Sequence, residues 1–182
     1  MSNTFLTSDS HWGHSNILKF FKDDEVTPLR HFSSVEEMDE TMIANWNKVV
    51  GPSDKVYHLG DLCFHNRNLD AVMPRLNGTK VLIKGNHDLL KLSAYAKYFK
   101  DVRAYHQLDK MMLSHIPMHE ESLGRWRMNL HGHLHSNKVM YTCPHKGYRQ
   151  EHPKYLNLSV EHWGYTPVDF ETIRKIAADR GL

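Results

Sequence analysis

Five short blocks rich in Asp, His and Asn constrain this chain more than any other feature of its sequence, because each block follows a predicted strand. The blocks are Asp9-Ser10-His11, Gly60-Asp61, Gly85-Asn86-His87-Asp88, Ser114-His115 and Gly132-His133-Leu134-His135. Strand ends can meet at one edge of a sheet, so we expect the five blocks to converge there. Glycines at 60, 85 and 132 precede the polar residues, at points where the backbone must turn sharply or be approached closely. The fold must therefore bring together segments that are far apart in the chain.

Hydrophobic periodicity predicts strands and helices in alternation in the first half of the chain and mostly strands in the second half. The expected strands are 4–8, 55–59, 80–84, 110–113, 127–130 and 155–160. The expected helices are 35–50, 69–76 and 170–178, with a capping box that starts at Ser34 for the first and Asp169 as the N-cap of the last. This order indicates an α/β layered sandwich with mixed sheets rather than a doubly wound nucleotide-binding fold, in one domain over residues 1–182.

The composition excludes several classes of protein. Lys and Arg number 23 and Asp and Glu 21, and this net charge of +2 argues against binding long nucleic acids through bulk charge. No apolar run approaches the roughly 20 residues of a membrane helix, and the N-terminus lacks the pattern of a signal peptide. Cys63 and Cys143 lie outside any CxxC motif, so we expect reduced thiols in a cytoplasmic protein. The exceptional number is fifteen histidines, a residue that commonly binds metals.

The five blocks contain seven side chains of the kinds that bind metals. They are Asp9, His11, Asp61, Asn86, His115, His133 and His135. Carboxylates, imidazoles and one amide without a thiolate suit Mn²⁺, Fe, Zn²⁺, Co or Ni. Seven donors are too many for one ion, whereas two ions bridged by a carboxylate would use them all, with Asp61 as the natural bridge. Alternation along a strand would place Asp9 with His11, and His133 with His135, as two pairs of donors.

In these motifs the chain resembles the calcineurin-like metallophosphoesterases, whose pattern DxH, GD, GNH followed by Asp or Glu, H and GHxH occurs here in order from Asp9 to His135. Small single-domain bacterial and phage members are also similar in the segments 8–14 and 157–161. The resemblance implies a four-layer α/β/β/α sandwich, in which two mixed β-sheets are flanked by helices.

The resemblance also implies roles for individual residues. One metal would be held by Asp9, His11, Asp61 and His135, and the other by Asp61, Asn86, His115 and His133. His87 would be the catalytic histidine and protonate the leaving oxygen, while Asp88 would either orient His87 or cap a helix near Leu89. The implied reaction is hydrolysis of a phosphodiester, or of a phosphomonoester, by a metal-bound hydroxide, with Mn²⁺ as the expected cofactor and a small, nucleotide-type substrate.

Other interpretations stay open from the sequence. The same site could belong to a phosphomonoesterase or a nuclease, or the fold could serve as a non-catalytic protein-binding scaffold. We expect His14, Arg125 and Arg127 to contact the substrate. The segments 119–127 and 141–153 are expected to rim the metal centre as specificity loops, and His131 is expected to be structural.

Overall fold

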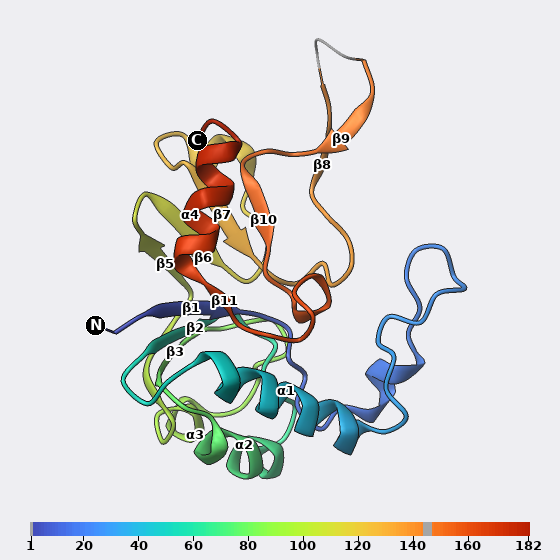
Figure 1. Ribbon diagram of the computed structural model, residues 1–182, viewed down its shortest axis with the longest axis vertical. Coiled ribbons are helices and arrows are strands. Elements are labelled where there is room, and N and C mark those ends of the chain that lie inside the picture. Colours follow the sequence, from blue (N-terminus) through green and yellow to red (C-terminus); the bar gives the residue numbers. More distant parts are fainter. Residues whose placement is uncertain (1, 144–146) are drawn as a thin grey trace.

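The computed structural model describes residues 2–143 and 147–182, and two β-sheets lie face to face within it (Figure 1). The first sheet has the order β11-β1-β2-β3-β4 and the second the order β10-β7-β6-β5. The edge strands β11 and β5 pair antiparallel with β1 and β6. The other described strand pairs within these two sheets are parallel. The bounds of the first sheet are β1 (Thr4–Thr7), β2 (Lys55–His58), β3 (Thr79–Ile83), β4 (Phe99–Arg103) and β11 (Val168–Asp169). The bounds of the second are β5 (Tyr105–Leu108), β6 (Met111–Ser114), β7 (Met128–His131) and β10 (Tyr155–Asn157).

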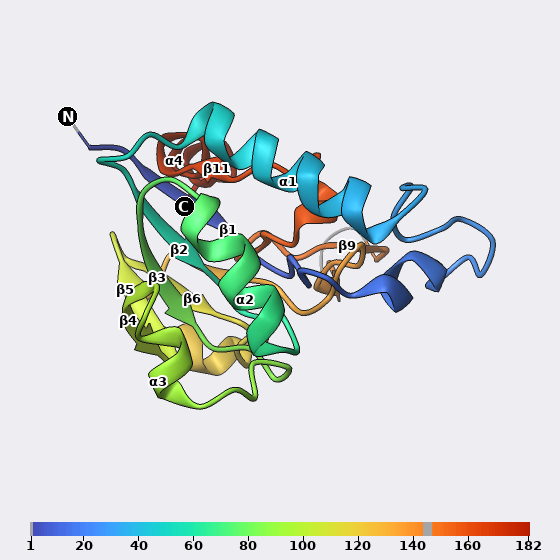
Figure 2. The ribbon, with the colours of Figure 1, turned by 90° about the horizontal axis from the view of Figure 1, so that it is seen from below.

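Helices cover the outer face of the first sheet (Figure 2). They are α1 (Val35–Val49), α2 (Asn66–Val72) and α3 (Leu92–Tyr95), and α2 continues into the short 3₁₀ helix η2 (Met73–Arg75). The helix α1 begins after Ser34, whose side chain accepts a hydrogen bond from the Glu37 amide at 3.1 Å, as the capping box predicts. Its apolar face buries Met38, Met42 and Trp46 in one cluster with residues of the first sheet.

A second apolar cluster fills the space between the two sheets. Leu6 and Val81 of the first sheet pack in it with Leu113 and Leu130 of the second. The helix α4 (Phe170–Asp179) adds Ile173 to the same cluster and closes the edge between β11 and β10. The predicted α/β sandwich of two mixed sheets with helices is therefore confirmed.

Smaller elements complete the fold. The 3₁₀ helix η3 (Glu120–Leu123) contributes Leu123 to a third apolar cluster, together with Met112 and Tyr155. Among the described residues, those of the first sheet take no part in this cluster. The strands β8 (Met140–Thr142) and β9 (Arg149–Glu151) form a hairpin that projects from the body (Figure 1). The remaining 3₁₀ helices are η1 (Ser15–Lys19) and η4 (Val160–His162). Among the described residues, the helices are too short or too polar to cross a membrane.

Some predicted elements differ in their extent. The expected strand 155–160 ends at Asn157, because the chain turns there to form η4. The expected helix 69–76 starts at Asn66 and changes to a 3₁₀ turn at Met73, where Pro74 stands near the start of η2. The helix expected near Leu89 is absent, and the first helical turn after that point begins at Leu92.

Candidate metal centre

The five polar blocks meet at the C-terminal ends of β1, β2, β3, β6 and β7, as the sequence predicts. Backbone hydrogen bonds tie the loops together: the Asp9 amide donates to the Gly60 carbonyl at 2.9 Å, and the Gly132 amide donates to the His115 carbonyl at 2.9 Å. The His133 amide crosses between the sheets and donates to Asp9 Oδ2 at 3.0 Å. The edge is thus a single structure to which both sheets contribute.

Two groups of side chains in this edge could each hold a metal ion. The first contains Asp9, His11 and His135, and the second contains Asp61, His115 and His133. In each group the donor atoms lie within 4.8 Å of one another. Asp61 Oδ2 lies 3.4 Å from His115 Nε2 and 3.7 Å from His11 Nε2, so the carboxylate stands between the two groups. This is the position expected of a bridging carboxylate.

Asn86 joins the second group. Its Oδ1 lies 2.9 Å from His115 Nε2 and 3.0 Å from His133 Nδ1. Donor atoms that bind one ion at about 2.1 Å are themselves about 3.0–3.4 Å apart in octahedral or tetrahedral geometry. The spacing in the second group therefore matches that of ligands around one ion.

The hydrogen-bond partner of His115 shows which ring nitrogen faces the group. His115 Nδ1 lies 2.8 Å from the Leu59 carbonyl, to which it donates, so Nε2 is the ring nitrogen that faces Asp61 and Asn86. Burial would lower the pKa of His115, but the neighbouring carboxylates of Asp61 and Asp9 outweigh it and raise that pKa. The group therefore attracts a positive charge, which a proton or a divalent cation can supply.

In the first group, His11 is a buried histidine whose ring nitrogens have no hydrogen-bond partner. The ring is 3% exposed, and neither of its nitrogens has a hydrogen-bond partner. Burial, helped by Arg30 and His135, lowers the pKa of His11 well below its usual value, so the ring is neutral. A buried imidazole with two unpaired nitrogens is rare unless an ion or a water satisfies it, and these residues fit a divalent cation.

Five of the candidate residues have a left-handed backbone. The φ angles are 57° at Asp9, 51° at His11, 54° at Asp61, 69° at His133 and 48° at His135. Strand alternation is therefore the wrong reason for the pairing of Asp9 with His11, because β1 ends at Thr7 and the tight loop after it aims both side chains. His133 and His135 also follow the end of β7, and they separate into the two different groups. Backbone strain of this kind concentrates at functional sites.

His87 lies on the solvent side of the two groups. Its side chain is exposed, and its ring centroid is 5.9 Å from that of His11 and 5.1 Å from that of Phe64. The His87 amide donates to Asp61 Oδ1 at 2.9 Å, which fixes the backbone beside the central carboxylate. The imidazole is thus free to meet a molecule that approaches the groups from solvent.

Asp88 has neither of its two expected roles. Its carboxylate accepts hydrogen bonds from the amides of Asp61, Leu62 and Gly85 at 2.8–2.9 Å, and no helix begins at Leu89. Both oxygens are used by the backbone, which leaves His87 without this partner. The buried Asp88 side chain therefore holds the loops after β2 and β3 together.

Replacing Asp88 with alanine should lower the free energy of unfolding by about 3–5 kcal/mol, because two buried amides and one partly buried amide lose their acceptor. Chemical denaturation in metal-free buffer measures this loss. The matched control is Asp70→Ala at an exposed position, where one hydrogen bond from the Tyr98 hydroxyl is lost. A loss below 1 kcal/mol in Asp88→Ala would contradict the structural role.

His14 lies next to the first group. Its ring centroid is 5.8 Å from that of His11 and 4.6 Å from that of Phe64. Burial, with smaller effects of Arg30 and His87, lowers the pKa of His14. The ring lines a cavity of about 340 Å³ together with Phe64 and Arg67. The expected position of His14 beside a substrate is consistent with this cavity.

Arg125 and Arg127 are not brought to the metal centre. Both precede β7, whereas the candidate groups follow its opposite end. The Arg127 guanidinium donates to the Leu182 carbonyl, and the Arg125 guanidinium lies 4.6 Å from the ring centroid of Trp126. The expectation that both arginines contact the substrate is therefore wrong, since the crossover from β6 to β7 carries the segment 119–127 away from the site.

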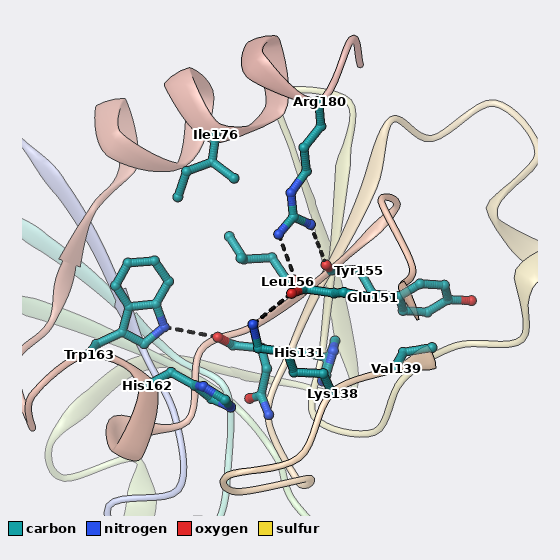
Figure 3. Close-up of a pocket in the computed structure, with 11 residues that line it drawn as sticks. His131, Lys138, Val139, Glu151, Tyr155, Leu156, His162, Trp163, Ile176 and Arg180 are labelled. Carbon is teal, nitrogen blue, oxygen red and sulfur yellow. Dashed lines mark hydrogen bonds and ion pairs between the residues drawn. The ribbon is translucent and has the colours of Figure 1, made fainter. Parts of the chain in front are cut away.

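The second expected specificity loop, 141–153, contains the hairpin of β8 and β9, and residues 144–146 of it lie outside the described part of the chain. At its base, Glu151 lines a cavity of about 280 Å³ with His131 and Arg180, which Figure 3 shows. None of the seven predicted donors lines this cavity. His131 is fully buried, and its Nδ1 lies 2.8 Å from the Gly132 carbonyl, consistent with the predicted structural role.

Two buried charged residues beside the first group were not predicted. Arg30 is 1% exposed and pairs with Glu161 at 2.7 Å, and Glu161 Oε1 lies 3.0 Å from His135 Nδ1. Burial alone would raise the pKa of Glu161, but Arg30 and His135 overcome it and lower that pKa to about 2. The only signal in the sequence was the likeness of the segment 157–161 to small metallophosphoesterases, which assigned Glu161 no role.

Comparisons with known proteins found chains that this one matches over most of their length. No family model matches the sequence. The chain is 29% identical over 200 residues to the Gene 66 protein of Mycobacterium phage L5, covering 90% of this chain and 89% of that protein. The crystal structure of the protein of unknown function AQ665 from Aquifex aeolicus matches with a TM-score of 0.70 and 27% identity, over 97% of this chain and all of that one. The chain is also 34% identical over 185 residues to the uncharacterized protein MJ1445 of Methanocaldococcus jannaschii, covering 97% of this chain and 92% of that protein. At this identity and coverage, the chain belongs to the same family as MJ1445.

Proposed function

We propose that this protein is a calcineurin-like metallophosphoesterase that hydrolyses a phosphodiester of a small, nucleotide-type substrate with the help of two divalent cations. The observation that carries the proposal is the pair of donor groups with the Asp61 carboxylate between them. The ordered motifs from Asp9 to His135 support the same family.

The first cation would be held by Asp9, His11, His135 and Asp61, and the second by Asp61, Asn86, His115 and His133. When bound, such a pair of ions would supply positive charge to phosphoryl oxygens and lower the pKa of a bound water. Mn²⁺ is the cation that we propose for testing first, although the same donors suit Fe, Zn²⁺, Co or Ni.

The side chains around the groups would position the substrate and move a proton. His87 is exposed at the mouth of the site and would donate its proton to the departing oxygen, as a general acid does. The presence of His87 is the reason for proposing a diester first, and the departing oxygen of a monoester would take the proton in the same way. Phe64 presents its ring beside His14 and His87, which would let it contact a flat group attached to the phosphate. The cytoplasm is the compartment that we propose, since the two cysteines lie outside any paired motif.

A panel of substrates tests the proposal. Protein stripped with a chelator and reloaded with Mn²⁺ is assayed on an aryl phosphodiester, an aryl phosphate, 2′,3′- and 3′,5′-cyclic nucleotides and short oligonucleotides. We expect two equivalents of Mn²⁺ to bind and metal-dependent hydrolysis to be fastest for a diester. Oligonucleotide cleavage that falls steeply with salt would instead favour the nuclease. Binding of no Mn²⁺, or no turnover with any of the five metals, would contradict the proposal.

A further inference from the structure

The buried Arg30 guanidinium contacts the loop that carries two of the predicted ligands. Its Nη1 donates to the Ser10 carbonyl at 2.9 Å, and its Nη2 donates to the Asp9 carbonyl at 2.5 Å. Asp9 and His11 both have a left-handed backbone in this loop. Arg30 therefore fixes the carbonyls of a strained segment whose side chains form most of the first donor group.

Arg30 is also linked, through Glu161, to His135, the third residue of the first group. Arg30 Nε donates to Glu161 Oε1 at 2.9 Å, and His135 Nδ1 donates to the same oxygen at 3.0 Å. This bond leaves His135 Nε2 to face the group. In the same segment as Glu161, the Ser159 hydroxyl donates to Asp9 Oδ2 at 2.9 Å. The ion pair thus contacts Asp9 and His135 directly, and it holds the Ser10 carbonyl that precedes His11.

The second donor group is held by different contacts. His115 Nδ1 donates to the Leu59 carbonyl at 2.8 Å, just beyond the end of β2. The Asp61 amide donates to Asp88 Oδ2 at 2.9 Å, and Asp61 Oδ1 accepts from the His87 amide at 2.9 Å. None of these three contacts involves Arg30 or Glu161. The two groups meet at Asp61, which lies between them, and at the His133 amide, which donates to Asp9 Oδ2 at 3.0 Å.

We propose that Arg30 and Glu161 are positioning residues that set the affinity of the first cation position alone, an inference that rests on the proposed dinuclear site. Hydrogen bonds from a carboxylate to the second nitrogen of a histidine fix its orientation, and losing such a partner weakens metal binding by about 10–100-fold. Removing the ion pair should therefore lower the affinity for one of the two cations by that factor and leave the affinity for the other unchanged.

Mn²⁺ titration of metal-free protein by calorimetry tests this inference, with circular dichroism to establish folding. The first variant is Glu161→Gln, which keeps an oxygen for His135 but removes the charge that pairs with Arg30. Because this leaves a buried guanidinium unpaired, the second variant combines Arg30→Met with Glu161→Gln and leaves no unpaired charge. The matched control is Glu151→Gln, which breaks the 2.7 Å ion pair between Glu151 and Arg180 away from both groups (Figure 3).

We expect wild type and Glu151→Gln to bind two Mn²⁺ equally well, and the two test variants to bind one Mn²⁺ normally and the other about 10–100-fold more weakly. To identify the weakened position, Glu161→Gln is added to His133→Ala, in which the second group is already weakened; the Mn²⁺ that His133→Ala still binds tightly should then bind more weakly as well. Unchanged binding of two ions, equal weakening of both, or failure of both test variants to fold would overturn the inference. Wild-type protein that binds no Mn²⁺ would instead contradict the proposed function.

Discussion

Replacing His115 with alanine should reduce hydrolysis of an aryl phosphodiester by at least about 1,000-fold, which corresponds to about 4 kcal/mol of transition-state stabilisation. The proposed reason is the position of His115 Nε2, which lies 3.4 Å from the central carboxylate oxygen of Asp61 and 2.9 Å from Asn86 Oδ1. Without this imidazole, the second group would keep Asp61, Asn86 and His133, and its cation would be held weakly. Steady-state kinetics in saturating Mn²⁺, together with calorimetric Mn²⁺ titration, measure both consequences.

The matched control for this variant is His119→Ala. His119 lies four residues further along the same crossover, and its side chain is exposed. We expect this control to keep both the turnover and the two Mn²⁺ equivalents of the wild type. Turnover in folded His115→Ala at the wild-type rate would exclude the proposed role of the second group, whatever the substrate.

The sequence predicted the convergence of the five blocks but not the geometry that achieves it. The order of strands and the glycines before the donors were sufficient to place Asp9, Asp61 and His133 at one edge. Left-handed loops could not be predicted in the same way, because φ depends on how neighbouring loops pack. The prediction that His133 and His135 form a pair assumed strand alternation, but both residues lie beyond the end of β7, where alternation does not hold.

Residues that support the site were harder to predict than the donors themselves. Arg30 lies in a segment without a motif, and only the folded chain brings it to Glu161, which is 131 positions away. Asp88 resembled a helix cap because it precedes an apolar residue, whereas its real partners are three backbone amides. The arginines 125 and 127 were predicted from their charge and from the expectation that the segment 119–127 rims the metal centre. Neither indicates the end of the strand at which a side chain lies.

Replacing Gly132 with alanine should have a large effect on both stability and metal binding. A methyl group at this position would overlap the Ser8 hydroxyl and Asp9 Oδ2, and both residues are fully buried. Neither can move freely, since Ser8 Oγ donates to the Leu59 carbonyl at 3.0 Å and Asp9 accepts from Ser159. We expect the free energy of unfolding to fall by about 2–3 kcal/mol, as in overpacked cores, and the first cation to bind more weakly as Asp9 is displaced. Chemical denaturation of metal-free protein and Mn²⁺ titration measure the two effects.

Gly124→Ala is the matched control, because a methyl group there would meet no atom within 4 Å. Gly124 has a φ of −11° and a ψ of −72°, which alanine disfavours, so the same substitution there should cost about 1 kcal/mol through the backbone alone and leave Mn²⁺ binding unchanged. If Gly132→Ala behaved like this control, the close approach of β7 to the loop after β1 would not be required for the edge to form. If stability fell while both cations bound normally, Asp9 would not be a ligand. Comparing Gly132→Ala with Gly124→Ala by stability and by Mn²⁺ binding thus distinguishes the role of Gly132 in packing the two sheets from its role in placing the proposed metal ligand Asp9.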